Sequence, residues 1–407
     1  MRPLRLFVFC MLFILTVGAV SAQDATPTPL PPIKIGFIAD QSGVGYLFAQ
    51  SQLAGLQVAV NEINAAGGLL GRRVEFVIRD AQLRADVGTT IARQMILEDG
   101  VELLVGPTSS AVALAVAVIA EENKIPLALH TSNSIALSTT GWNKYMVQVV
   151  PHTTIETRAA AQYMSDLGYT MWSSIGPDYA FGRDGFASFK PRLEELVPGA
   201  QIISEQWPPL SERDLTTYIT ALQAAAPEAI FGNLWGDQFV TFTQQAAPVG
   251  LFETSTYIGL MDLDYMRAIG DDLPDGMYGY TRAPFYALEG EMVDSFMERY
   301  QRLTAGQYPA DWAIMMYDAV MALRAAVEQA GTTDGDAVAA AFDGLEFESL
   351  RGTLTIRDCD HMANVGAYVG KATYTDEYPF PILTETLFVP FDEVALTCEE
   401  VLATRAP

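Results

Sequence analysis

Short apolar runs alternate with segments of helical periodicity along most of this chain, and this alternation constrains the fold more than any other feature. In the first part of the chain, apolar runs occupy residues 33–39, 74–78, 103–105 and 125–129. Between the first two runs, apolar residues recur at helical spacing from Leu53 to Ile63. A strand–helix alternation of this kind predicts a parallel sheet that is covered by helices on both faces.

The alternation begins again at about residue 151. A second set of apolar runs lies at residues 172–175, 201–206, 229–231 and 256–258. Two long helical patterns then follow at about 289–305 and 310–330, without a strand between them. Because they cannot extend a strand–helix–strand pattern, we expect these two helices to cover the first sheet.

These patterns predict an α/β protein with two doubly wound, Rossmann-like lobes. The 407 residues also exceed what one ordinary core accommodates. The chain should cross between the lobes near residues 150, 281 and 352, which gives a hinge of three strands. The expected parts are lobe 1 (33–150 plus 282–352), lobe 2 (151–281 plus 353–392) and a C-terminal tail (393–407).

The first 22 residues have the layout of a secretory signal peptide. Arg2 and Arg5 precede an apolar run, and Val20-Ser-Ala22 supplies the small residues of a cleavage site. A retained membrane anchor is the alternative, but the run is shorter than the about 20 residues that a span needs. Residues 23–32 contain four prolines and predict an extended linker. We therefore expect a periplasmic or extracellular protein.

Charge and cysteine content agree with an exported protein. The net charge is −25, and loss of the two signal-peptide arginines would make it −27. Such a surface repels nucleic acid and anionic lipid, so we expect no nucleic-acid partner, and we expect a monomer. Cys359 and Cys398 remain after cleavage, and in an oxidising compartment a disulfide between them would hold the tail. Two separate thiols are the alternative.

Ligands of open α/β sheets bind beyond the carboxyl ends of the strands, so the loops at those ends are the candidate site. In the first lobe these loops are residues 40–46, 106–111 and 130–134. Free amides and a hydroxyl at the start of the helix near Ser109 suit a carboxylate, although ordinary helix capping would place the same residues there. The candidate contacts on this side are Tyr46, Ser109, Ser110, His130, Thr131 and Ser132.

The second lobe offers aromatic and acidic side chains in the corresponding loops. Phe181 and Trp235, together with Tyr179, could form an aromatic wall, or they could serve only to pack the lobes together. Asp237 or Asp262 could receive an ammonium or amide donor, and a turn or capping role is the alternative for each. The candidate contacts on this side are Phe181, Trp235 and Asp262.

Several motifs at these loops occur together, namely Asp40-Gln-Ser-Gly43, Val60-Asn-Glu-Ile-Asn-Ala-Ala-Gly-Gly-Leu69, Leu104-Val-Gly-Pro107, Asp178-Tyr-Ala-Phe-Gly182 and Gln244-Gln-Ala-Ala-Pro-Val-Gly250. In these motifs the chain resembles the periplasmic solute-binding proteins of branched-chain amino acid and amide ABC transporters. The resemblance spans residues 33 to about 392. It implies the type I periplasmic-binding, or Venus-flytrap, fold, in which two lobes close over a ligand and a membrane permease reads the closed form.

The resemblance also implies roles for individual residues. The loops at Thr108 to Ser110 and at Thr131 to Ser132 match those that bind a ligand carboxylate in amino acid members of the family. Phe181 stands where a tyrosine packs on the ligand, and Leu234 or Trp235 matches the next aromatic position. The acid that receives the ligand ammonium falls at Met261 or Asp262. If Met261 holds that position, an amide or an aromatic carboxylate fits better than an amino acid.

No catalytic function is expected. The three histidines lie in separate segments, and the chain has no HExxH, GxSxG or P-loop motif and no GxGxxG after its first strand. We therefore expect no enzyme, no cofactor and no metal site. The predicted function is the substrate-binding component of an ABC importer, with a branched-chain or related amino acid placed ahead of an aromatic carboxylate, a short amide or urea. A ligand-sensing receptor domain for a separate signalling partner is the alternative.

Overall fold

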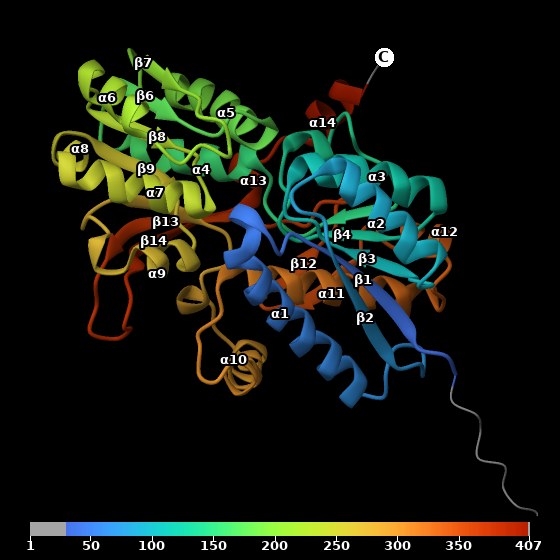
Figure 1. Ribbon diagram of the computed structural model, residues 1–407. Helices are drawn as coiled ribbons and strands as arrows, with labels where there is room; N and C mark the ends of the chain where they lie inside the picture. The colour runs from blue at the N-terminus through green and yellow to red at the C-terminus, as the bar shows by residue number, and fades with distance from the viewer. Residues whose placement is uncertain (1–29, 406–407) are drawn as a thin grey trace, which may run out of the picture.

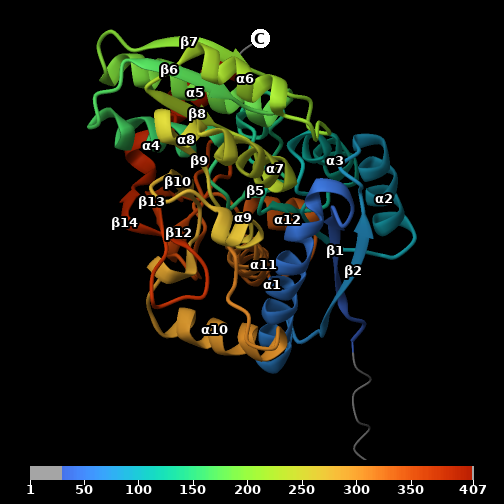
Figure 2. The ribbon, with the colours of Figure 1, turned by 60° about the vertical axis from the view of Figure 1, so that its left-hand side comes forward.

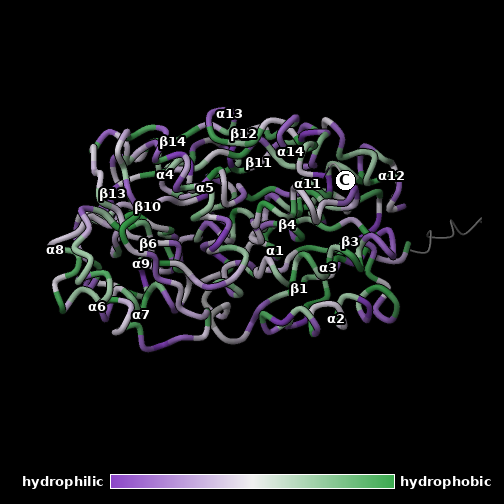
Figure 3. Tube along the Cα trace, turned by 90° about the horizontal axis from the view of Figure 1, so that it is seen from above, coloured by the Kyte–Doolittle hydropathy of each residue, from purple (hydrophilic) through white to green (hydrophobic). Residues whose placement is uncertain are grey.

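The computed structural model describes residues 30–405 and contains two large sheets in two lobes that lie side by side (Figures 1 and 3). The predicted signal peptide (1–22) and most of the predicted linker (23–32) lie outside the described residues. The first sheet is parallel throughout, in the order β2-β1-β3-β4-β5. Its strands are β1 (Ile33–Ala39), β2 (Val74–Asp80), β3 (Leu103–Val105), β4 (Leu127–Leu129) and β5 (Met146–Gln148).

The second sheet has seven strands and repeats the same plan. Its parallel part has the order β7-β6-β8-β9-β10, so the first strand of each sheet in chain order lies between the second and the third. These strands are β6 (Met171–Ile175), β7 (Gln201–Gln206), β8 (Ala229–Gly232), β9 (Thr256–Leu260) and β10 (Tyr278–Thr281). Two antiparallel strands, β13 (Ala367–Thr373) and β14 (Ile382–Val389), extend this sheet beyond β10. The repeated order confirms the prediction of two doubly wound lobes.

Helices cover both faces of the first sheet, as predicted. Side chains of β1 alternate between two apolar cores: Phe37 packs into the core that includes α1 (Tyr46–Ala65) and α11 (Asp311–Ala330), and Ile38 packs into the core of α2 (Ala85–Leu97) and α3 (Ser110–Asn123). Helices α1 and α11 lie side by side (Figure 2). A Cβ atom at Gly55 would lie 2.2 Å from the carbonyl oxygen of Ala313, so glycine permits this close approach. Helices α10 (Glu291–Leu303) and α12 (Gly335–Ala340) pack against α1 and α11, respectively.

The second lobe has helices of its own. They are α4 (Thr153–Ser165), α5 (Ala180–Leu196), α6 (Thr216–Ala225), α7 (Gly236–Ala246), α8 (Leu251–Thr254) and α9 (Leu263–Ile269). Helix α4 packs along α5 and against β10 and β13, whereas α7 packs with α6 and α9. Within the described range, no helix combines the length and the apolar character that crossing a membrane requires.

A hairpin that the sequence did not indicate precedes the third passage between the lobes. Strand β11 (Glu346–Ser349) pairs with β12 (Gly352–Thr355), and the hairpin packs on α11 of the first lobe. The expected boundary between residues 352 and 353 would divide this hairpin. Further along, Met362 forms a bridge with Gln148 of β5. We therefore propose that the third crossing lies between Ala363 and Ala367.

Helix α11 anchors the hinge through two buried acids that lie two turns apart. The Asp311 carboxylate accepts the backbone N–H groups of Arg282 (2.9 Å) and Ala283 (2.7 Å), which belong to the crossing after β10. The Asp318 carboxylate pairs with Arg351 at 2.8 Å, and Arg351 donates to the carbonyl of Val149, in the crossing after β5, at 2.6 Å. One helix of the first lobe thus fixes two of the three crossings.

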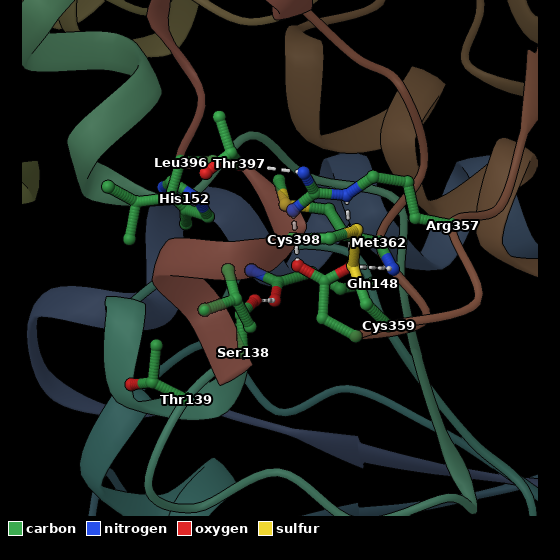
Figure 4. Close-up of polar contacts among 12 residues, drawn as sticks. Ser138, Thr139, Gln148, His152, Arg357, Cys359, Met362, Leu396, Thr397 and Cys398 are labelled. Atoms are coloured by element: carbon green, nitrogen blue, oxygen red, sulfur yellow. Dashed lines mark hydrogen bonds and ion pairs between the residues drawn. A yellow bond between two sulfur atoms is a disulfide. The ribbon is translucent and has the colours of Figure 1, made fainter. Parts of the chain in front are cut away.

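The C-terminal tail returns from the second lobe to the first. Helix α13 (Phe391–Val394) packs against α4, whereas in α14 (Cys398–Arg405) the Arg405 side chain donates to the carbonyl of Ser138, in the first lobe. The predicted disulfide is present between Cys359 and Cys398, with their Cα atoms 5.8 Å apart (Figure 4). Beside it, Arg357 donates to the Leu396 carbonyl at 2.7 Å. The tail is therefore a fourth connection between the lobes.

Removing this disulfide should destabilise the protein. The bond closes a loop with a sequence separation of 39 residues, for which loss of chain entropy in the unfolded state predicts about 4 kcal/mol. We expect C398S to lower the free energy of unfolding by about this amount in urea titrations. Reductant should lower the stability of the unsubstituted protein equally and leave C398S unchanged. Equal stability of the oxidised and reduced proteins would contradict the prediction.

Candidate functional site

A small cavity, with a free volume of about 20 Å³, lies between the two lobes, at the carboxyl ends of the parallel strands. It is lined by Thr108, Ser110, Thr131, Asn133, Tyr179, Phe181, Trp235, Leu260, Arg282 and Trp312. All of these residues except Tyr179 are buried, so the lobes are closed over the cavity. This volume is far below the ~300–1,000 Å³ that is typical of ligand sites, so the side chains nearly fill the cavity and the lobes must part to admit a ligand.

The first lobe supplies a polar wall. Thr108 and Ser110 follow β3, and Thr131 and Asn133 follow β4, as expected from the position of these loops. The backbone amides of Thr108 and Ser109, which we expected to be free for a ligand carboxylate, instead donate to Asp40 at 3.0 and 3.3 Å. The first lobe therefore presents mainly hydroxyl groups to the cavity at this helix terminus.

The second lobe supplies an aromatic wall. Phe181 follows β6, and Trp235 follows β8. The Trp235 ring lies 5.7 Å, between centroids, from Phe48 of α1. Phe48 in turn lies 4.5 Å from Trp312, at the start of α11. This row of rings continues from one lobe to the other, so the apolar part of the cavity forms only when the lobes meet.

One cationic group lines the cavity among the described residues. Arg282, in the crossing after β10, forms an ion pair with Glu156 of α4, and its guanidinium lies 5.0 Å from the centre of the Trp312 ring. Burial opposes the charged form, but the surrounding acidic groups, Glu156 and Asp262 foremost, together outweigh burial and raise the pKa of Arg282. Nη1 of Arg282 and Nε1 of Trp312 are buried and have no hydrogen-bond partner within the described chain. The cavity therefore holds unused N–H donors.

Neither candidate acid lines the cavity. Asp237 lies at the surface, where it forms an ion pair with Arg213 at 3.3 Å. Asp262 is fully buried and lies 3.0 Å from the hydroxyl of Thr281, outside the cavity lining. Burial and the neighbouring Asp311 carboxylate raise the pKa of Asp262 well above its ordinary value, which favours the uncharged carboxyl group.

The cavity brings together four of the nine predicted contacts: Ser110, Thr131, Phe181 and Trp235. The structure places the other five, namely Tyr46, Ser109, His130, Ser132 and Asp262, outside the lining. Tyr46 is 58% exposed, and the Ser132 hydroxyl donates to the carbonyl of Pro107. His130 is buried against Phe37, and burial lowers its pKa to about 3.

Sequence reasoning missed Arg282 and Trp312. Arg282 directly follows β10, the last parallel strand of its sheet. The expectation that ligands bind beyond the carboxyl ends of the strands therefore applies to Arg282 as well. No local pattern identifies Trp312, because its place in the cavity depends on the packing of α11 against α1.

Polar contacts join the lobes at the rim of the cavity. The Ser51 hydroxyl of α1 donates to Asp264 of α9 at 3.0 Å. In the same way, Ser134 of the first lobe donates to Asp184 of the second. Burial raises the pKa of Asp264 to about 6, in spite of Arg267 nearby. These contacts hold the closed form, and opening would return the carboxyl groups to water.

Two lobes of the same topology that close over one internal cavity define a bilobal solute-binding protein. The sequence pattern of the periplasmic binding protein family matches residues 32–377. A Leu/Ile/Val-binding protein from Rhizobium johnstonii, BraC3, is 25% identical over 84% of this chain and 92% of its own length.

Two solved structures share the fold. A periplasmic binding protein from Burkholderia mallei has a TM-score of 0.83 and 23% identity, covering 91% of this chain and 98% of its own. An ABC transporter solute-binding protein from Rhodopseudomonas palustris, in complex with 3,4-dihydroxybenzoic acid, has a TM-score of 0.79 and 23% identity, covering 88% of this chain and 97% of its own.

The chain belongs to the periplasmic binding protein family, in the group that includes the Leu/Ile/Val-binding proteins. It is the extracytoplasmic substrate-binding component of an ABC importer, as predicted, and not an enzyme. Members of this family are exported, and they deliver a small molecule to a membrane permease.

Lobe closure should depend on pH through Asp264. Its pKa is about 6 in the closed form and should return to about 3.9 in water when the lobes open. Because the closed-form pKa is the higher one, protonation favours closure, and this contribution is lost as pH rises through about 6. We expect the closed-to-open ratio of the ligand-free protein to rise about tenfold from pH 7 to pH 5.

Small-angle X-ray scattering of the ligand-free protein at both pH values would measure this ratio, with D264N as the matched control. His130 and His152 should not contribute, because burial lowers their pKa to about 3 and they stay uncharged between pH 5 and pH 7. An identical pH response in D264N would assign the effect to another group.

Proposed function

We propose that the cavity binds a small aromatic carboxylate, which this protein delivers to its permease. The observation that carries the proposal is the lining, which combines aromatic rings with the Arg282 guanidinium and includes no acidic side chain in the described chain. The Phe181 and Trp235 rings can pack on a ligand ring once the lobes part to admit it, and a carboxylate can accept the unused N–H groups of Arg282 and Trp312.

An α-amino acid fits this lining less well. Its ammonium group needs an acceptor, yet Asp237 lies at the surface and Asp262 lies outside the cavity. The Arg282 guanidinium would also repel a second cation in so small a space. These observations place the aromatic carboxylate ahead of the branched-chain amino acid that the sequence analysis put first.

The comparisons support both ligand classes. The relative from Rhizobium johnstonii is named for binding leucine, isoleucine and valine, and the structure from Rhodopseudomonas palustris contains 3,4-dihydroxybenzoic acid. Because identity to each is at most 25%, the choice between the two classes rests on the residues of this cavity.

We also propose that cleavage before Gln23 exports the protein and that it acts as a monomer. The apolar run after Arg5 and the small residues at Val20-Ser-Ala22 support export. Both walls of the cavity come from this chain, one from each lobe, so the proposed site requires no second copy. Mass spectrometry of the secreted protein and its sedimentation velocity would test the two statements.

A thermal-shift screen tests the ligand class. Benzoate, 4-hydroxybenzoate and 3,4-dihydroxybenzoate should raise the melting temperature, because a ligand at 100 times its Kd adds about 2.7 kcal/mol to stability. Leucine, isoleucine, valine, short amides and urea should have little effect. A shift with leucine and none with the aromatic acids would overturn the proposal and restore the amino acid.

A pair of variants tests the cavity itself. W312F keeps a ring but removes the Nε1 donor, and we expect it to weaken benzoate binding about tenfold to a hundredfold in titration calorimetry. D237N is the matched control, because Asp237 lies at the surface, and its affinity should equal that of the unsubstituted protein. Equal affinities for W312F and D237N would show that the ligand does not use this donor.

A further inference from the structure

We infer that Gln52, a residue behind the cavity wall, makes the site selective for an anionic group by turning two threonine hydroxyls into donors that face the ligand. This inference rests on the proposed function of the cavity as a carboxylate site. Gln52 belongs to α1, is fully buried and does not itself line the cavity. It is therefore a positioning residue, which acts through Thr108 and Thr131.

The contacts of Gln52 are specific. Its amide Nε2 donates to Oγ1 of Thr108 at 3.2 Å and to Oγ1 of Thr131 at 3.2 Å. These threonines come from different loops, after β3 and after β4, and both line the cavity. One amide group thus uses its two N–H bonds to hold two hydroxyls side by side in the wall.

The orientation of the Gln52 amide sets the direction of each hydrogen bond: Nε2 contacts the two hydroxyls, whereas Oε1 is buried and has no hydrogen-bond partner among residues 30–405. An amide nitrogen can only donate, whereas a hydroxyl has one proton and can also accept. Each threonine oxygen therefore accepts from Gln52 and keeps its own proton. No protein acceptor for either proton occurs in the described part of the chain, so both protons are available to a ligand.

A third hydroxyl is oriented in the same sense. Oγ of Ser110 accepts the backbone N–H of Ser134 at 3.2 Å, which again leaves its proton free. The unused N–H groups of Arg282, Trp235 and Trp312 add further donors on residues of the lining. A carboxylate only accepts, and its about four acceptor positions can each take one of these donors, whereas an uncharged amide brings donors of its own.

The test compares two ligands of the same shape that differ in one group, benzoate and benzamide. Q52E replaces the donating amide with a carboxylate that only accepts, so both threonine protons should turn toward residue 52 and away from the ligand. We expect the benzoate-to-benzamide affinity ratio to fall by about tenfold or more in titration calorimetry. Q52M, which neither donates nor accepts, should lower the ratio less, and it serves as the test variant if Q52E does not fold.

A matched background separates this mechanism from simple charge repulsion. In the double variant T108V T131V the hydroxyls are absent, so adding Q52E should change the ratio little if Gln52 acts through them. The inference would be overturned if Q52E lowered the benzoate-to-benzamide ratio equally in the T108V T131V background. It would also be overturned if Q52E weakened the binding of both ligands and left their ratio unchanged. If the unsubstituted protein binds no benzoate, the proposed function fails, and leucine with leucinamide then tests Gln52 on the same carboxylate-to-amide difference.

Discussion

A buried guanidinium holds this structure together at its hinge. Arg282 is fully enclosed, and a buried charge is tolerated only if an opposite charge pairs with it. Glu156 supplies that pairing from the second lobe, and its carboxylate also accepts the side-chain amide of Asn133, in the first lobe, at 2.8 Å. Asp311 holds the backbone of the same crossing. Arg282 also lines the cavity, so the same side chain belongs to the hinge and to the ligand site. Opening the lobes therefore disturbs both.

Apolar packing and polar contacts both stabilise the closed form, and they respond differently when the lobes open. The row of rings formed by Phe48, Trp235 and Trp312 loses its contacts as soon as the lobes separate, because packing forces act over short distances. The rim contacts, such as that between Ser51 and Asp264, exchange hydrogen bonds with the protein for hydrogen bonds with water, so their net contribution is small. A ligand stabilises the closed form only to the extent that it binds the closed form more tightly than the open form. Contacts that it makes equally in both forms do not shift the equilibrium.

Much of the fold could be predicted from the sequence, and less of the site. Strand–helix alternation is local and periodic, so the two lobes and the long helices at 291–303 and 311–330 were found within two residues of their ends. Strand β11, and with it the hairpin to β12, was missed because β11 is short and half exposed. The loops at the carboxyl ends of the strands supplied Ser110, Thr131, Phe181 and Trp235. A loop position does not give the direction of a side chain, so His130 and Tyr46 point elsewhere, and Trp312 depends on packing between distant helices.

The disulfide gives the chain a covalent topology that the backbone alone does not have. Cys359 lies on the first-lobe side of the third crossing, and Cys398 begins the helix that returns to that lobe. The segment between them contains β13 and β14, so it forms a ring that leaves the first lobe, passes through the second sheet and comes back. Cleavage of the chain anywhere within that ring would leave one molecule, with its two pieces still joined. A cut in this strand pair therefore leaves the chain covalently joined, whereas a cut at either of the other two crossings divides it.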